Sequence, residues 1–144
     1  MRLKGMVEYM VKDVLYNKIS IIERCVIRIQ EVYNHNSDNL MDYTKQDSIV
    51  LNIQRAVEAT IDIAMHLVSE KKLGIPQNSR DAFEALNQHN IIDDRMLNIL
   101  KAMIGFRNIA VHNYQNLNLE ILQKVIENHL KDFEEFTYLI SKVK

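Results

Sequence analysis

Residues 49–76 read IVLNIQRAVEATIDIAMHLVSEKKLGIP, and this stretch decides the fold class. Apolar side chains recur in it every three or four residues, which is the spacing of one face of an α-helix. That face comprises Ile49, Ile53, Val57, Thr60, Ala64, Leu67 and Val68. Gly74 and Pro76 follow, and glycine at a C-cap with proline just beyond is typical of a helix end. The stretch therefore predicts a long amphipathic helix that ends near Lys72.

The same helical period continues on both sides of this stretch. Helices are expected at about Leu3–Asn34, from Thr44 or Asp47 to Lys72, at 79–88, at Asp93–Val111 and from Asn118 onward. One proline and three glycines among 144 residues are too few for the turns of a strand-rich fold. We therefore predict a single all-α domain over residues 1–144, an up-down bundle of four long helices and one short helix.

Composition indicates the cellular compartment in which the chain is expected to function. Cys25 is the only cysteine, so no internal disulfide can form, and this fits a reducing cytoplasm. Apolar runs are too short to cross a bilayer, and charges interrupt the region where a secretory signal needs an apolar core. We expect a cytoplasmic protein without a membrane partner. Because the net charge is −1, a nucleic acid would be held by a local basic patch or by a surface made on assembly.

One segment is not explained by packing. Residues 105–114 read GFRNIAVHNY, in which polar side chains gather at the end of an apolar helix. Histidine can accept or donate a proton near neutrality, and arginine presents a forked set of donors that matches phosphate oxygens. Arg107 and His112 are therefore candidate catalytic residues for phosphodiester cleavage without a metal or other cofactor. Attack by a ribose 2′-OH would restrict the reaction to RNA and leave a 2′,3′-cyclic phosphate.

The spacing of this pair constrains the site. An α-helix advances about 100° per residue, so positions five apart are separated by about 140°. Arg107 and His112 cannot aim at one atom from a regular helix, whereas Asn108 shares a face with His112 and could orient it or a phosphate. Either the helix loosens near His112, or a second subunit contributes, which predicts a homodimer with the motif at its interface. A plainer alternative is that both cations simply suit a helix C-terminus.

The same segment resembles a known signature. Arg-x4-His-x-Tyr, here Arg107, His112 and Tyr114, is similar to the motif of HepT toxins in the HEPN superfamily. Residues 51–83, LNIQRAVEATIDIAMHLVSEKKLGIPQNSRDAF, resemble the block that precedes the catalytic helix in that family. The resemblance runs from Ile49 onward and covers most of the chain.

The resemblance implies properties that spacing does not show. HepT toxins are homodimeric helix bundles that cut RNA without metal in a cleft between subunits. They accompany a nucleotidyltransferase antitoxin of the MntA kind, which transfers AMP onto the motif tyrosine, here Tyr114. Such a group would place bulk and negative charge beside Arg107 and His112 and would repel RNA phosphate. An alternative is a non-catalytic HEPN subunit that pairs with a nucleotidyltransferase or binds nucleotide, and a purely structural bundle is a third.

Three charged residues precede the motif in the chain. Arg55, Glu58 and Asp62 fall on one polar stripe of the helix predicted from the opening stretch. They form either an ion-pair row or a second shell that orients Arg107 or His112. The histidines and carboxylates do not show the spacing of a metal site, so no metal is expected.

Overall fold

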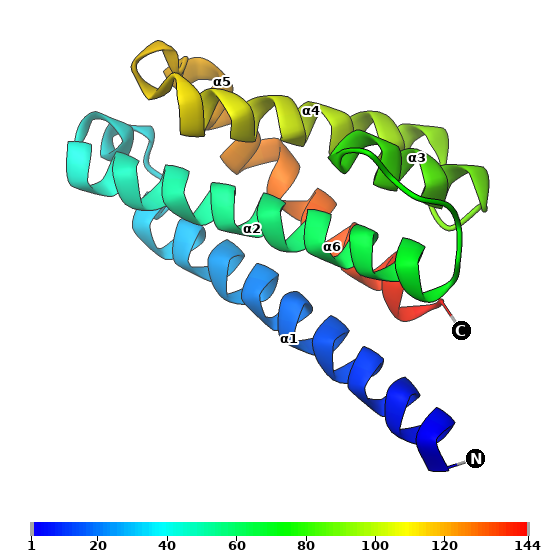
Figure 1. Ribbon diagram of the computed structural model, residues 1–144. Coiled ribbons are helices and arrows are strands. Elements are labelled where there is room, and N and C mark those ends of the chain that lie inside the picture. Colours follow the sequence, from blue (N-terminus) through cyan, green and yellow to red (C-terminus); the bar gives the residue numbers. More distant parts are fainter. Residues whose placement is uncertain (1, 144) are drawn as a thin grey trace.

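The computed structural model describes the backbone of residues 2–143 and the side chains of residues 13–143. All secondary structure in this part of the chain is helical, which confirms the predicted fold class. The α-helices are α1 (Arg2–Tyr33), α2 (Tyr43–Glu70), α3 (Ser79–Gln88), α4 (Asp94–His112), α5 (Leu119–Lys124) and α6 (Leu130–Ser141). Figure 1 shows α1, α2, α4 and the α5–α6 segment alternating in direction, as expected for an up-down bundle. None of the described helices has an apolar stretch long enough to cross a membrane.

Side-chain caps explain where several helices begin. The side chains of Asp42, Asn78 and Asp93 accept hydrogen bonds of 2.8 to 3.1 Å from backbone N–H groups in the first turns of α2, α3 and α4. Asn118 does the same for α5, accepting from Glu120 N–H at 2.8 Å. These acceptors satisfy N–H groups that have no partner within the helix. The helices predicted at 79–88 and from Asn118 onward are thus capped by Asn78 and Asn118.

The end of α2 differs from the expectation that Gly74 would occupy the C-cap position. Lys72 takes the left-handed conformation with φ of 55°, and Gly74 lies two residues further along with φ of 133°. Leu73 N–H donates to Val68 C=O at 2.9 Å and Lys72 N–H to Ser69 C=O at 3.3 Å. This pair of bonds is the Schellman motif, which ends the helix two residues before the predicted boundary.

The last helix begins where the sequence predicts but is not uniform. A π-helical segment, Val125–His129, joins α5 to α6. Tyr33 at the end of α1 donates a hydrogen bond to Glu127 within this segment. One apolar stripe is nonetheless continuous through these segments, since Leu122, Ile126, Leu130, Phe133 and Ile140 are all buried. The wider turn therefore allows a polar contact to α1 without breaking the buried face.

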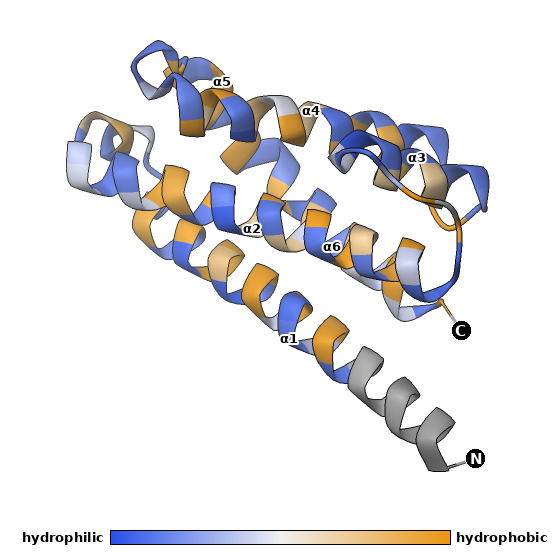
Figure 2. Cartoon of the chain, viewed as in Figure 1, coloured by the Kyte–Doolittle hydropathy of each residue, from blue (hydrophilic) through white to orange (hydrophobic). Residues whose placement is uncertain are grey.

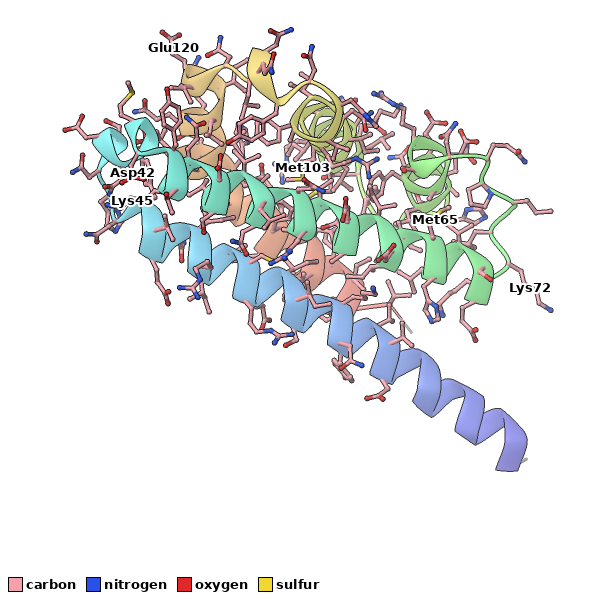
Figure 3. All side chains as sticks on the ribbon, turned by 60° about the vertical axis from the view of Figure 1, so that its left-hand side comes forward. Asp42, Lys45, Met65, Lys72, Met103 and Glu120 are labelled. Atoms are coloured by element: carbon pink, nitrogen blue, oxygen red, sulfur yellow. The ribbon has the colours of Figure 1, made fainter. Side chains whose placement is uncertain are left out.

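The core lies where the helices face one another. Hydrophobic residues gather on the inner faces of α1, α2 and α6, and hydrophilic residues follow the outer surfaces and the connections (Figure 2). Phe83 of α3 and Phe136 of α6 meet edge to face, with ring centroids 6.3 Å apart, and both are fully buried. Truncation of such a phenylalanine to alanine costs about 3–5 kcal/mol. This core fixes α4, and therefore the motif, against α2; Figure 3 shows Met103 of α4 beside α2.

Candidate active site

The motif lies at the C-terminal end of α4. This helix is regular as far as His112, and the N–H of Asn113 still donates to Ile109 C=O at 2.9 Å. The helix does not loosen before His112, so the first of the two options from the sequence is wrong for this chain. Arg107 and His112 consequently point about 140° apart and are separated by about 7.5 Å along the helix axis.

Arg107 and Asn108 form a pair. The Nε of Arg107 donates to Asn108 Oδ1 at 3.0 Å, and the arginine is half-buried whereas the asparagine is exposed. The amide oxygen of Asn108 thus accepts from Arg107 in this structure and forms no hydrogen bond with His112. The ring of His112 is exposed and forms no hydrogen bond with another residue between 13 and 143. An unbonded imidazole at a helix end is available to a substrate or to a second subunit.

Tyr114 lies just beyond α4, in a short 3-10 turn, Tyr114–Asn116. Its hydroxyl lies between two acceptors, Asp47 Oδ1 at 2.5 Å and Gln46 Oε1 at 3.2 Å. The buried Gln46 is itself fixed, because its Nε2 donates to Leu40 C=O at 3.0 Å. Burial, the hydrogen bond to Asp47 and the charge of Asp47 together raise the pKa of Tyr114 far above its usual value. The structure thus holds the phenol protonated against the start of α2.

Sequence reasoning missed both acceptors of Tyr114. Asp47 is 67 residues away in the chain, and nothing local links it to the motif. A signal existed for Gln46, which stands one turn before Ile49 and Val50 on the buried face of α2. A polar side chain on an apolar stripe is expected to have a specific partner.

An apolar groove borders the motif. Its volume is about 450 Å³, and Ile99, Ala102 and Phe106 of α4 form one wall, opposite Ile121 and Val125. The stripe of α4 that lines this groove continues to Ile109, which is 45% exposed. Uncovered apolar side chains in a contiguous row are a feature of interfaces more than of free surfaces.

The three charged residues of α2 do not join the motif within the described chain. Asp62 accepts a hydrogen bond from Lys18 of α1 at 2.9 Å, and Glu58 accepts one from Gln54 at 3.2 Å. Arg55 lines a different groove, between α1 and α2. The contact between Asp62 and α1 agrees with the ion-pair interpretation of this stripe. The residues from 13 to 143 contain no group of three or more histidine, cysteine or acidic side chains placed to hold a metal ion.

Comparisons with known proteins bear on the same region. Residues 22–140 match the family described as Ribonuclease HepT-like. The chain is 52% identical over 128 residues to the mRNA nuclease HepT of Shewanella oneidensis, an alignment that covers 89% of this chain and 96% of that protein.

Solved structures give a similar result. A crystal structure of a toxin–antitoxin with AMP-PNP contains a chain that superposes with a TM-score of 0.87 at 50% identity, covering 91% of this chain and 99% of that one. The tri-AMPylated Shewanella oneidensis HEPN toxin in complex with MNT antitoxin also gives a TM-score of 0.87 at 50% identity, covering 91% and 98%.

Proposed function

Because this chain belongs to the Ribonuclease HepT-like family, we propose that it is a metal-independent endoribonuclease toxin with Arg107 and His112 as its catalytic residues. The observation that carries the assignment of residues is their placement. Both stand at the accessible end of α4, and the ring of His112 is exposed without a bond to another described residue.

The proposed reaction uses the ordinary chemistry of these side chains. His112 accepts the proton of a ribose 2′-OH or donates one to the leaving 5′-oxygen, and Arg107 neutralises charge that develops on the phosphate. The 2′-oxygen forms a bond to phosphorus as the bond to the 5′-oxygen breaks. The products are a 2′,3′-cyclic phosphate and a 5′-hydroxyl end, and DNA is not cut because it lacks the nucleophile.

A homodimer with the motif at its interface reconciles this chemistry with the geometry. Since α4 is regular, Arg107 and His112 of one chain diverge, so each site takes its arginine and its histidine from different subunits. A two-fold interface then creates two equal sites, because each subunit supplies the residue that the other lacks. The exposed Ile109 and the apolar groove that continues its stripe on α4 provide the surface that a second copy would cover.

Gly105 supports the same assembly. It stands in the interior of α4, two residues before Arg107, where glycine costs about 0.5–1 kcal/mol relative to alanine. A Cβ at this position would meet no atom within 4 Å, so packing of this chain does not require glycine. Close approach of a helix from a second subunit accounts for the missing side chain.

Control by a nucleotidyltransferase antitoxin completes the proposal. The related toxin structure is AMPylated and in complex with its MNT antitoxin, and Tyr114 occupies the motif tyrosine of this chain. In the transfer, the Tyr114 oxygen bonds to the α-phosphorus of ATP, pyrophosphate leaves, and the phenol proton passes to a base. The added phosphate stands two residues from His112 and repels RNA. The same transfer disrupts the bond from Tyr114 to Asp47.

The experiment that tests the ribonuclease assignment uses purified protein, RNA and EDTA. The wild-type protein should cut RNA and leave cyclic phosphate ends, and His112→Asn should abolish cutting without a change in melting temperature. His35→Asn is the matched control, because His35 is an exposed histidine in the connection after α1. RNA that stays intact with the wild-type protein contradicts the proposal and favours the non-catalytic binding subunit.

A further inference from the structure

A second cluster of cationic side chains lies on the seam between α1 and α2, on other elements than the motif. A groove of about 440 Å³ runs there, with Arg24, Arg28 and Glu31 on the α1 side and Asn52 and Arg55 on the α2 side. The buried Cys25 lies among these lining residues. We refer to this surface as the arginine groove.

The charge of the arginine groove is positive and largely uncompensated. Glu31 is the one acidic residue of its lining, and it contacts Arg28 at 3.5 Å, with both side chains about 60% exposed. An exposed ion pair of this kind contributes little and can be exchanged for another anion. Arg24 and Arg55 form no ion pair with any residue from 13 to 143. Three arginines against one glutamate thus concentrate positive charge in a chain whose net charge is −1.

The two arginines without an ion pair line one groove although they come from different helices. Burial raises the pKa of the Cys25 thiol, and the positive charges of Arg55 and Arg24 act in the opposite direction. The same groove is lined by Arg24, Arg55 and this cysteine. Arg24 and Arg28 are also four residues apart and therefore neighbours on one face of α1.

We propose that the arginine groove binds the phosphodiester backbone of the RNA substrate. This inference rests on the proposed ribonuclease function. Guanidinium groups bind phosphate oxygens through paired hydrogen bonds, and a chain without a general positive charge must draw its RNA affinity from such a local patch. Arg107 alone supplies one permanent cation to the motif, which is too little to hold a strand. The groove would bind the RNA away from the scissile phosphate. It would therefore determine the affinity for RNA and not the rate of the cleavage step.

The test measures RNA binding separately from cleavage. The proteins carry His112→Asn so that the labelled 30-nucleotide single-stranded RNA stays intact. Arg24→Gln with Arg55→Gln removes both unpaired charges of the groove. Lys72→Gln with Arg80→Gln is the matched control, since these exposed residues lie near the end of α2 and the start of α3. Melting temperature checks that both double variants fold.

The groove variant should bind the RNA at least tenfold more weakly than the control. Its slope of log K against log salt should be shallower by about 1.4, since each phosphate contact of a single strand contributes about 0.7. When the same groove substitutions are made in protein that retains His112 and therefore cleaves RNA, KM should rise while kcat stays the same. Equal binding by the two double variants overturns the proposal. Unchanged RNA binding with loss of the complex with a nucleotidyltransferase partner also overturns it and assigns the groove to a protein surface.

These outcomes are distinguishable from failure of the proposed function. If the wild-type protein does not cut RNA, the ribonuclease assignment fails whatever the groove binds. If it cuts RNA and the groove variants bind and cut as the control does, only the arginine groove proposal is wrong.

Discussion

The hydroxyl of Tyr114 donates a hydrogen bond of 2.5 Å to Asp47 Oδ1, across 67 residues of sequence. This bond ties the turn after α4 to the first turns of α2, and Gln46 supports it from the same helix. The residue that we propose as the site of AMP transfer is thus held by an acidic partner. Asp47 can accept the phenol proton, and once an AMP phosphate is attached the two negative groups repel each other.

Asp47 should control the ionisation of Tyr114. Replacement of Asp47 by Asn removes the negative charge beside the phenol, and the pKa of Tyr114 should fall toward the ordinary tyrosine value. Titration of isotope-labelled tyrosine followed by NMR measures this pKa directly. Asp38→Asn is the control. It removes an exposed acidic residue from the connection between α1 and α2 and should leave the pKa of Tyr114 unchanged. An unchanged titration in Asp47→Asn would show that the carboxylate does not hold the proton.

Tyr114 should be the residue that receives AMP. Intact mass of the protein produced together with its nucleotidyltransferase partner should show added mass in AMP-sized steps, and Tyr114→Phe should abolish the addition. Tyr43→Phe is the matched control, since Tyr43 is 79% exposed at the start of α2 and is the more accessible phenol. Modification that persists in Tyr114→Phe, or disappears in Tyr43→Phe, contradicts the assignment.

Gly105→Ala separates the stability of the subunit from the stability of the assembly. The new methyl group meets nothing within the chain and improves helix propensity, so the isolated subunit should gain about 0.5–1 kcal/mol in free energy of unfolding. The same methyl group should weaken a dimer in which a second helix approaches Gly105. Sedimentation measures the dimer and denaturant unfolding measures the subunit. A dimer of unchanged affinity would exclude close approach at this position.

Tyr33 should contribute to the way the free energy of unfolding changes with pH. Burial and the hydrogen bond to Glu127 raise the pKa of Tyr33 from 10.0 to about 12. The folded protein therefore holds this proton more tightly than the unfolded chain, so the stabilisation is complete below the unfolded pKa and is lost as the pH rises through the folded pKa. Between about pH 10 and 12, the free energy of unfolding should fall more steeply for the wild type than for Tyr33→Phe. Equal slopes for the two proteins would contradict this.

Several helices were predictable because their cause is local. The apolar period of residues 49–68 and the caps at Asn78 and Asn118 depend only on neighbours in the chain, and the structure places helices α2, α3 and α5 accordingly. The π-helical segment Val125–His129 was not predictable from the period, because it serves a contact between Glu127 and Tyr33 of another helix. The left-handed conformation of Lys72 was not predicted for a different reason. Gly74 lies two residues further along, and glycine is the residue that usually adopts this conformation at a helix end.

The sequence could nominate candidate residues for the site but could not predict their contacts. Arg107, Asn108, His112 and Tyr114 lie within eight residues of the chain, and the structure places the first three on α4 and Tyr114 in the turn after it. The bond of Tyr114 to Asp47 depends on how the turn after α4 meets α2, which no local pattern encodes. Arg55 was considered as support for the motif, and in the structure it lines the groove between α1 and α2 together with Arg24.

The central claim is that each active site takes Arg107 from one subunit and His112 from the other. Arg107→Ala and His112→Ala should each be inactive alone, and a refolded equimolar mixture of the two should regain RNA cleavage in EDTA. Random assortment predicts about a quarter of the wild-type activity, because half of the dimers are mixed and each has one complete site. A mixture as inactive as the separate variants, despite proven exchange of subunits, would contradict the account.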